Sequence, residues 1–343
     1  MNQSRRFFLK STGGVAAYCG LNPVQSLFAA PANKAKVTAN KTLVAIFLRG
    51  GIDGLNLVVP YGDEHYYKHR RDIAIRRPGG GSQTAKDIDG FFGLHPSAAA
   101  LEPLFKDHSA VALQAVGYSK NTRSHFEEQD TWETGVIGNT VSSDGWLNRH
   151  LMTSEGHGTI RAVSIGGNLP RILRGKAAAY AIRGISDLAM PKLAGDQQQI
   201  HAALEHAYCS KPEQHHDAAQ DLLSQTATAT LEGARQLETI AKEEYKPANG
   251  AKYPASNIGR QLTEAARLIK SGIGTEIIEI DYGGWDTHNN QGGYSGGYAN
   301  RLKELTQAIA AFNKDMGSKM QDTLVLTLSD FGRTVRENGT RGT

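Results

Sequence analysis

The chain has 343 residues, enough for one large domain or two smaller ones, and a formal net charge of +4. Three of its positive charges, Arg5, Arg6 and Lys10, stand among the first 30 residues, which contain no acid, so the rest of the chain carries only +1. A nucleic acid or an anionic membrane is therefore not expected as a partner. Beyond Cys19 in that first stretch only Cys209 remains, so core burial rather than an intramolecular disulfide must stabilise the fold.

The first 35 residues are predicted to be a signal peptide and a linker. The stretch "SRRFFLK" precedes an acid-free apolar run with small residues near Ala30, and it resembles a twin-arginine export signal. The run is too short to span a bilayer, so we expect no stable membrane anchor. The alternative is two chance arginines before an apolar helix. The signal predicts a periplasmic or secreted protein whose partner during export is the twin-arginine translocase.

Strands and helices are predicted to alternate through residues 36–343, which we take as one domain. Continuous rather than alternating apolar runs indicate strands of a largely parallel sheet covered by helices on both faces. The predicted strands are 42–48, 110–116, 160–166, 275–281 and 323–329. The predicted helices are Pro96–Lys106, Ser256–Lys270 with Ser256 as N-cap, and Tyr298–Met316, whose apolar stripe predicts core packing. The fold class is therefore α/β.

Two segments fall outside this alternation. Residues 197–245 are polar and alanine-rich, and they are predicted to form two helices within a helical insertion over 197–250. In this insertion His215 and His216 could bind a metal, although an exposed polar connection is the favoured interpretation. Residues 77–90 contain three consecutive glycines and are predicted to be a flexible surface loop.

Three of the predicted strands end in an acid within a glycine-bearing loop: Asp53, Asp286 and Asp330. The carboxyl ends of parallel strands meet at one edge of a sheet, where three unpaired carboxylates would repel one another. A divalent cation relieves that repulsion, and His288 in "GGWDTHNNQ" supplies an imidazole suited to zinc. Manganese, calcium or magnesium are alternatives. Each acid also has a structural interpretation as a turn or cap residue.

A nucleophile is predicted after the second strand, in "GYSKNTRSHFEEQDTWETG". Ser124 and Glu127 form the capping box Ser-x-x-Glu at a helix start, which is a sufficient structural role for both. The same position places the Ser124 hydroxyl at the positive end of a helix, where an anionic substrate would bind. Arg123 is suited to hold an oxyanion. Thr122 is an alternative nucleophile.

Several motifs together resemble a known family. They are the export signal, "LVAIFLRGGIDGLNLVVPYGD", "GLHP", "SHFEEQDTWETG", "GGWDTHNNQ" and "LSDFGRTVRENG". The chain is similar to the exported domain-of-unknown-function family numbered 1501, within the alkaline-phosphatase-like and sulfatase-like superfamily. The resemblance implies a mixed sheet between helices with a one- or two-metal hydrolase site at its carboxyl edge. Asp53, Ser124, Asp286, His288 and Asp330 fall at matching places.

The sequence departs from that superfamily at two points. Phe331 follows the late-strand aspartate where a histidine is common, so one metal ligand is in doubt. No Cys-x-Pro-x-Arg or Ser-x-Pro-x-Arg occurs, which argues against a formylglycine sulfatase. A protein kinase is excluded because "HRRD" (69–72) and "SDFG" (329–332) stand far too widely apart, and no glycine-rich loop with a downstream strand lysine is present. Neither G-x-S-x-G nor G-x-G-x-x-G is present, which argues against an ordinary serine hydrolase and a dinucleotide enzyme.

These patterns predict an exported metal-dependent hydrolase of phosphate or sulfate esters, acting on a small-molecule or glycan ester. The nucleophile is the Ser124 hydroxyl or a metal-bound water, and Arg123 or Arg333 holds the substrate oxyanion. His125 is predicted to bind substrate. The rival prediction, favoured by Phe331, is an inactive exported binding or assembly protein on the same fold.

The last residues, "RENGTRGT", form an open loop after the fifth predicted strand. In the resembling family this loop continues into an Asp-His-Gly motif. We therefore expect an incomplete reading frame that lacks on the order of one strand and helix, roughly 30 residues.

Overall fold

The computed structural model describes residues 41–343 apart from 120–121, 139–143, 155, 157, 159, 186–201, 204–205 and 207–217. The predicted export signal, Cys209, His215 and His216 therefore lie outside the described residues.

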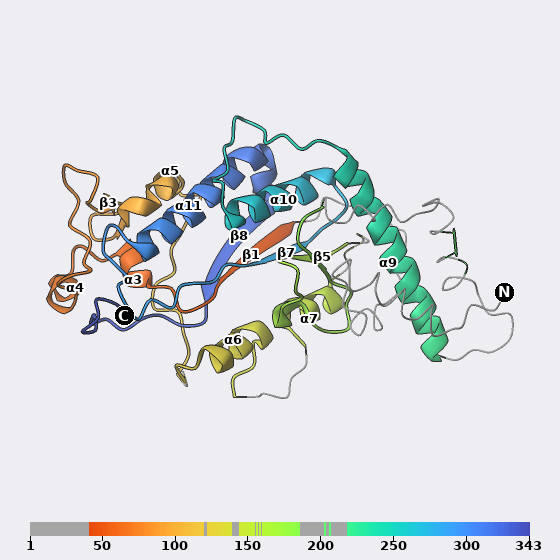
Figure 1. Ribbon diagram of the computed structural model, residues 1–343, viewed down its shortest axis with the longest axis horizontal. Helices are drawn as coiled ribbons and strands as arrows, with labels where there is room; N and C mark the ends of the chain where they lie inside the picture. Colours follow the sequence, from red (N-terminus) through yellow and green to blue (C-terminus); the bar gives the residue numbers. More distant parts are fainter. Residues whose placement is uncertain are drawn as a thin grey trace.

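A five-stranded parallel sheet forms the centre of the protein, with the strand order β6-β5-β7-β1-β8 (Figure 1). Four of its strands confirm predicted ones, while β6 follows β5 in the chain and was not foreseen. The strands are β1 Thr42–Leu48, β5 Ala162–Ile165, β6 Tyr180–Ile182, β7 Ile277–Asp281 and β8 Thr323–Ser329. Because all five run in one direction, the loops after β1, β7 and β8 meet at the same edge.

Helices cover the two faces of this sheet (Figure 1). On one face lie α10 Asn257–Ser271 and α11 Gly297–Met316. On the other lie α6 His125–Thr134 and α7 Trp146–Thr153. The α/β architecture predicted from the sequence is confirmed at this level.

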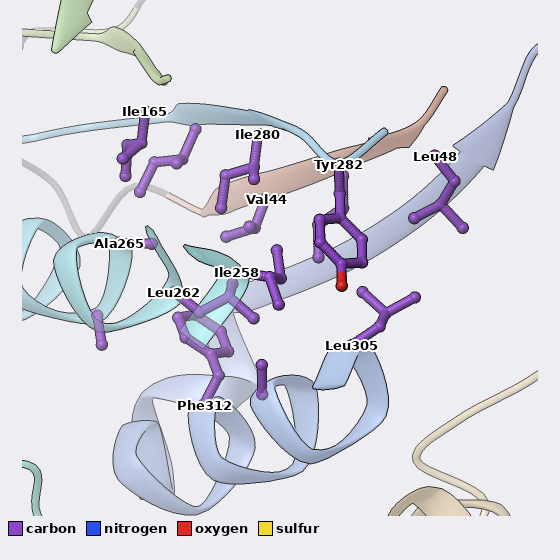
Figure 2. Packing of buried hydrophobic residues seen from close by; sticks show 14 of the residues in the cluster. Val44, Leu48, Ile165, Ile258, Leu262, Ala265, Ile280, Tyr282, Leu305 and Phe312 are labelled. Atoms are coloured by element: carbon purple, nitrogen blue, oxygen red, sulfur yellow. The ribbon is translucent and has the colours of Figure 1, made fainter. Parts of the chain in front are cut away.

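The face under α10 and α11 carries the main hydrophobic core. Val44 of β1 and Ile280 of β7 point toward Leu262 of α10 and Phe312 of α11, and all four are completely buried (Figure 2). The predicted apolar stripe of α11 is confirmed: four of its residues are buried and Ile309 is partly buried. The four are Tyr298, Leu302, Leu305 and Phe312. Burying one such side chain stabilises the fold by roughly 1.5–3 kcal/mol.

The predicted start of α10 is also confirmed. The Ser256 side chain accepts a hydrogen bond from the backbone N–H of Gly259 at 3.3 Å, which satisfies one unpaired donor of the first turn. The helix ends at Gly272, whose left-handed conformation favours glycine.

A smaller antiparallel sheet with the strand order β2-β4-β3 is formed by the part of the chain that follows β1. Because Lys86–Asp87 pair with β4, the prediction of a loop over 77–90 is wrong for its last part. This region comprises α3 Gly54–Leu57, β2 Val58–Val59, α4 Glu64–His69, β3 Lys86–Asp87, β4 Gly93–Leu94, η1 Pro96–Leu101 and α5 Glu102–Lys106. The last two confirm the predicted helix Pro96–Lys106.

The strand predicted over residues 110–116 is absent. Val111, Leu113 and Val116 are 62–80% exposed, and no ladder pairs them with another strand. The segment is held at its ends instead, since Ala110 donates to the carbonyl of Leu104 at 2.8 Å and the Tyr118 hydroxyl bonds to Glu128. An apolar run is not sufficient for a strand when no neighbouring edge receives it.

The helical insertion is described in part. Residues 218–242 form α9 Ala218–Lys242, which confirms one of the two predicted helices. Arg267 of α10 donates to the carbonyls of Ile240 and Glu243, so the end of α9 is tied to the core layer. The remaining short helices are η2 Arg171–Leu173 and η4 Gly317–Asp322. Among the described residues, no helix combines the length and apolar character that crossing a membrane requires.

Candidate functional site

Asp330, directly after β8, is the centre of the hydrogen-bond network at the carboxyl edge. Its carboxylate is fully buried and accepts hydrogen bonds from the N–H groups of Gly51 at 2.6 Å and Gly50 at 3.1 Å. It also accepts from His125 Nδ1 at 2.6 Å and Gln129 Nε2 at 3.1 Å. Burial alone would raise the pKa of Asp330, but these hydrogen bonds outweigh it and lower the pKa. The acid is therefore ionised, and a proton on Nδ1 of His125 fits this contact.

The glycines of "RGG" allow the first loop to wrap around this acid. Gly50 and Gly51 have φ angles of +116° and +70°, a region that L side chains rarely adopt. A Cβ on Gly50 would also lie 2.7 Å from the backbone nitrogen of Asp286. Both loops can therefore approach closely only because residue 50 has no side chain.

Helix α6 presents three residues to Asp330. His125, Gln129 and Trp132 are spaced i, i+4 and i+7, so they share one helix face. The first two bind the Asp330 carboxylate, and Trp132 Nε1 donates to its backbone carbonyl at 2.8 Å. Ser124 caps the helix, with its side chain accepting from the N–H of Glu127 at 3.5 Å. The capping interpretation of Ser124 is thus confirmed, while its role as a nucleophile stays a prediction.

His125, Asp286 and His288 form a cluster that could hold a metal ion. One ligand atom of each lies within 4.8 Å of the other two. Asp286 Oδ1 is 2.9 Å from His288 Nε2 and 3.5 Å from His125 Nε2. Two ligands of a tetrahedral zinc lie about 3.3 Å apart when each bond is about 2.0 Å long. The two distances to Asp286 are near the spacing that such an ion requires. Two of the residues, Asp286 and His288, were predicted as ligands.

Arg333 contacts two residues of this cluster, Asp286 and His288. Its side chain is only 3% exposed and donates to the carbonyls of Gly51 at 2.7 Å and Trp285 at 3.2 Å, to that of Gly50, and to Asp286. Burial raises the pKa of Asp286, but the hydrogen bond and charge of Arg333 outweigh that effect and lower it. Arg333 thus joins the loops after β1 and β7 and keeps Asp286 ionised, whereas its predicted contact with substrate stays a prediction.

Asp53 lies in a different buried network. Its Oδ2 accepts from Arg70 and from Gln291, both at 2.6 Å, and the side chain is 1% exposed. Its Oδ1 has no hydrogen-bond partner among the described residues. Asp53 is not part of the cluster formed by His125, Asp286 and His288. The structure therefore brings together two of the four predicted metal ligands, places Asp330 behind His125, and gives Asp53 an arginine partner.

The residues just before α6 are held by Glu128. Thr122 donates its backbone N–H at 2.7 Å and its hydroxyl at 3.0 Å to the same Glu128 oxygen. Arg123 has a φ of +59° and is exposed. The hydroxyl of Thr122, the alternative nucleophile, therefore donates to Glu128.

Arg49 is a further site residue that the sequence did not reveal. Its guanidinium bonds to Gln129 at 2.9 Å and Glu133 at 3.0 Å on α6, and to Asp281 at the end of β7 at 2.5 Å. Gln129 in turn donates a hydrogen bond to Asp330, so Arg49 and Asp330 share this partner. The helical spacing of His125, Gln129 and Trp132 was a usable signal for the last two, but nothing in the sequence indicates that Arg49 reaches α6.

Phe331 also contacts the site. Its ring stacks on His125 with centroids 4.5 Å apart and planes 30° from parallel. It therefore helps to fix the orientation of the imidazole.

The fold and this site define a parallel α/β protein with a histidine–aspartate cluster at the carboxyl edge of its sheet. The family described as "Protein of unknown function (DUF1501)" matches residues 40–343, so the chain belongs to this family. No curated protein and no solved structure matches the chain.

Proposed function

We propose that this protein is an exported metal-dependent hydrolase of phosphate or sulfate esters, with an alkaline-phosphatase-like fold and zinc as its metal. The observation that carries the proposal is the convergence of His125 Nε2, His288 Nε2 and Asp286 Oδ1 at the carboxyl edge of the sheet. Two imidazoles and one carboxylate are the donor set of several catalytic zinc sites.

Asp330 supports the proposal from behind the ligands. A metal-binding histidine commonly donates its second ring N–H to a carboxylate, which fixes the tautomer and the ring orientation. Asp330 accepts from Nδ1 of His125 at 2.6 Å and so directs Nε2 toward Asp286. Asp330 was predicted as a metal ligand. We propose instead that it orients the ligand His125.

The exposure of the cluster favours catalysis over a structural role for the metal. The His288 and Asp286 side chains are 62% and 47% exposed. Three protein ligands would leave a fourth position of a tetrahedral zinc open toward solvent, which distinguishes catalytic from structural sites. Zinc bound there would lower the pKa of a water molecule and polarise the ester oxygen.

The start of α6 would receive the anionic group of the substrate. The N–H groups of its first turn and its dipole favour a phosphate or sulfate near Ser124 and His125. Arg123, exposed just before the helix, is proposed to hold the oxyanion, and Ser124 or a water molecule to attack. A twin-arginine signal would deliver the protein to the periplasm or the medium.

Zinc binding by the purified protein tests this proposal. We expect about one zinc per chain and hydrolysis of an aryl phosphate or aryl sulfate. His288→Ala should lose both, whereas His150→Ala, an exposed histidine of α7, should keep both. A protein that binds zinc, manganese, calcium and magnesium no better than His288→Ala would contradict the proposal and favour the binding or assembly protein.

A further inference from the structure

The segment 338–343 runs beside the loop that carries His288. The N–H groups of Asn290 and Gln291 donate to the carbonyls of Thr340 and Arg341, both at 2.9 Å. Thr343 donates in return to the carbonyl of Thr287 at 3.2 Å. The two stretches are thus bonded to each other on both sides of His288.

The carbonyl of His288 is the focus of this contact. It accepts from Asn338 Nδ2 at 2.7 Å and from the hydroxyl of Thr340 at 2.8 Å. Gly342 lies against the same atom, and a Cβ on it would be 2.3 Å from the carbonyl oxygen of His288 and 2.4 Å from that of Thr287. The approach is possible only because residue 342 is glycine.

The side chain of His288 is exposed and is contacted by Asp286 and Arg333 at one atom, Nε2. It is 62% exposed, so neighbouring side chains constrain it weakly, and its Nε2 is 2.9 Å from Asp286 and 3.4 Å from Arg333. The position of its backbone therefore contributes to the direction of the imidazole beside these two contacts. His125, by contrast, is fixed through its side chain by Asp330 and Phe331.

We infer that the segment 338–343 positions His288. Gly342 sets the distance between this segment and the backbone of residues 287–288. The inference rests on the proposed metal site, in which His288 is one of three ligands. It assigns the two histidines separate supports: Asp330 for His125 and the segment 338–343 for His288.

The test compares two glycine-to-alanine variants in the full chain. Gly342→Ala forces the backbone of residues 287–288 to move, whereas a Cβ on Gly339 would meet nothing within 4 Å. We expect zinc binding to weaken about 10- to 100-fold in Gly342→Ala, the range typical for residues that orient a ligand, and to stay unchanged in Gly339→Ala. Asn338→Ala, which removes one hydrogen bond without adding an atom, should show a smaller loss if Gly342→Ala does not fold.

A second measurement separates positioning from general destabilisation. At one fixed pH, proton NMR of zinc-free protein should show the chemical shifts of the His288 ring changed in Gly342→Ala and those of the His125 ring unchanged. Zinc affinity equal to the parent in Gly342→Ala, with the parent losing zinc on His288→Ala, would overturn the positioning role and leave the proposed function intact. If the parent binds no zinc, the proposed function fails, and an unaltered His288 resonance would overturn this inference as well.

Discussion

Each face of the central sheet packs an apolar cluster, the smaller one around Leu147 and Leu151 of α7, but the two faces differ at the carboxyl end, as strand β7 shows. Ile278 and Ile280 point into the core under α10 and α11, while Glu279 and Asp281 point to the side of α6 and α7. On the first face buried aliphatic and aromatic side chains touch one another (Figure 2). On the second face, at the carboxyl end, Arg49 joins Asp281 to Gln129 and Glu133 of α6.

The difference teaches where stability and function reside. Apolar packing does not depend on pH, and each cavity made in it costs free energy. The face under α10 and α11 should therefore contribute most of the free energy of unfolding. Hydrogen bonds to charged groups are directional and so orient side chains, but each contributes only about 1.5–3 kcal/mol. The α6 face can therefore hold His125 in place while contributing less to the stability of the whole domain.

The largest expected effect is the loss of a core side chain on the apolar face. Phe312→Ala removes a fully buried ring of α11 and should lower the free energy of unfolding by about 3–5 kcal/mol. Urea unfolding measures it, and Phe126→Ala, 87% exposed on α6, is the matched control with little expected change. Zinc affinity of the folded fraction should be unchanged in both. Weakened zinc binding in Phe312→Ala would show that the two faces are not separable.

Asp330→Asn should affect both stability and zinc binding. The amide presents an N–H₂ group to at least one donor among Gly50, Gly51, His125 and Gln129, which should cost about 1–3 kcal/mol. His125 also loses its ionised partner, so zinc affinity should fall about 10- to 100-fold. Asp322→Asn, an exposed acid at the other end of β8, is the control. Parental zinc affinity in Asp330→Asn would remove Asp330 from the site.

Regular elements could be read from the sequence because their signals are local. The apolar runs of β1, β7 and β8 and the Ser256 cap each lie within a few residues of the feature they specify. The segment 110–116 has the same local pattern, yet it forms no strand. Whether a run becomes a strand depends on a partner edge, which no local pattern contains.

The sequence predicted those site residues that directly follow strands. Asp286, His288 and Asp330 come to one edge because parallel strands end there. Their side-chain partners could not be predicted, since His125 and Asp330 are 205 residues apart in the chain. Asp53 also follows a strand at that edge, but Arg70 binds its carboxylate. The sequence places a residue at an edge, and the turn after the strand decides where its side chain points.

Glu279 and Asp330 predict opposite pH dependences of the free energy of unfolding. Burial, followed by the negative charge of Asp281, raises the pKa of Glu279 well above its ordinary value of 4.5. A raised pKa in the folded state contributes stability below pH 4.5 that is lost as the pH rises through the folded pKa. Glu279→Gln should remove this loss, which amounts to at most about 1.4 kcal/mol per pH unit. Asp330 has the opposite sign, since its lowered pKa contributes stability that disappears as the pH falls below 3.8.

Thermal unfolding of the parent and of Glu279→Gln from pH 4 to 9 measures this effect. The variant should become the more stable of the two as the pH rises, and Glu64→Gln, an exposed glutamate of α4, should follow the parent. Parallel curves for the parent and Glu279→Gln would mean that Glu279 is ionised in the folded protein, and the polar face would then carry one more buried negative charge.

The smallest effect on stability is expected at Ser124, where the polar face meets the proposed chemistry. Ser124→Ala removes the side-chain cap of α6 and should cost about 1 kcal/mol, while Ser256→Ala removes the equivalent cap of α10 on the apolar face at a similar cost. The two variants should therefore lose similar stability and differ only in which helix loses its cap. If Ser124 is the nucleophile, Ser124→Ala abolishes hydrolysis of an aryl ester with zinc affinity intact, whereas Ser256→Ala keeps it. Equal activity in the two variants would restrict Ser124 to capping and assign the attack to water.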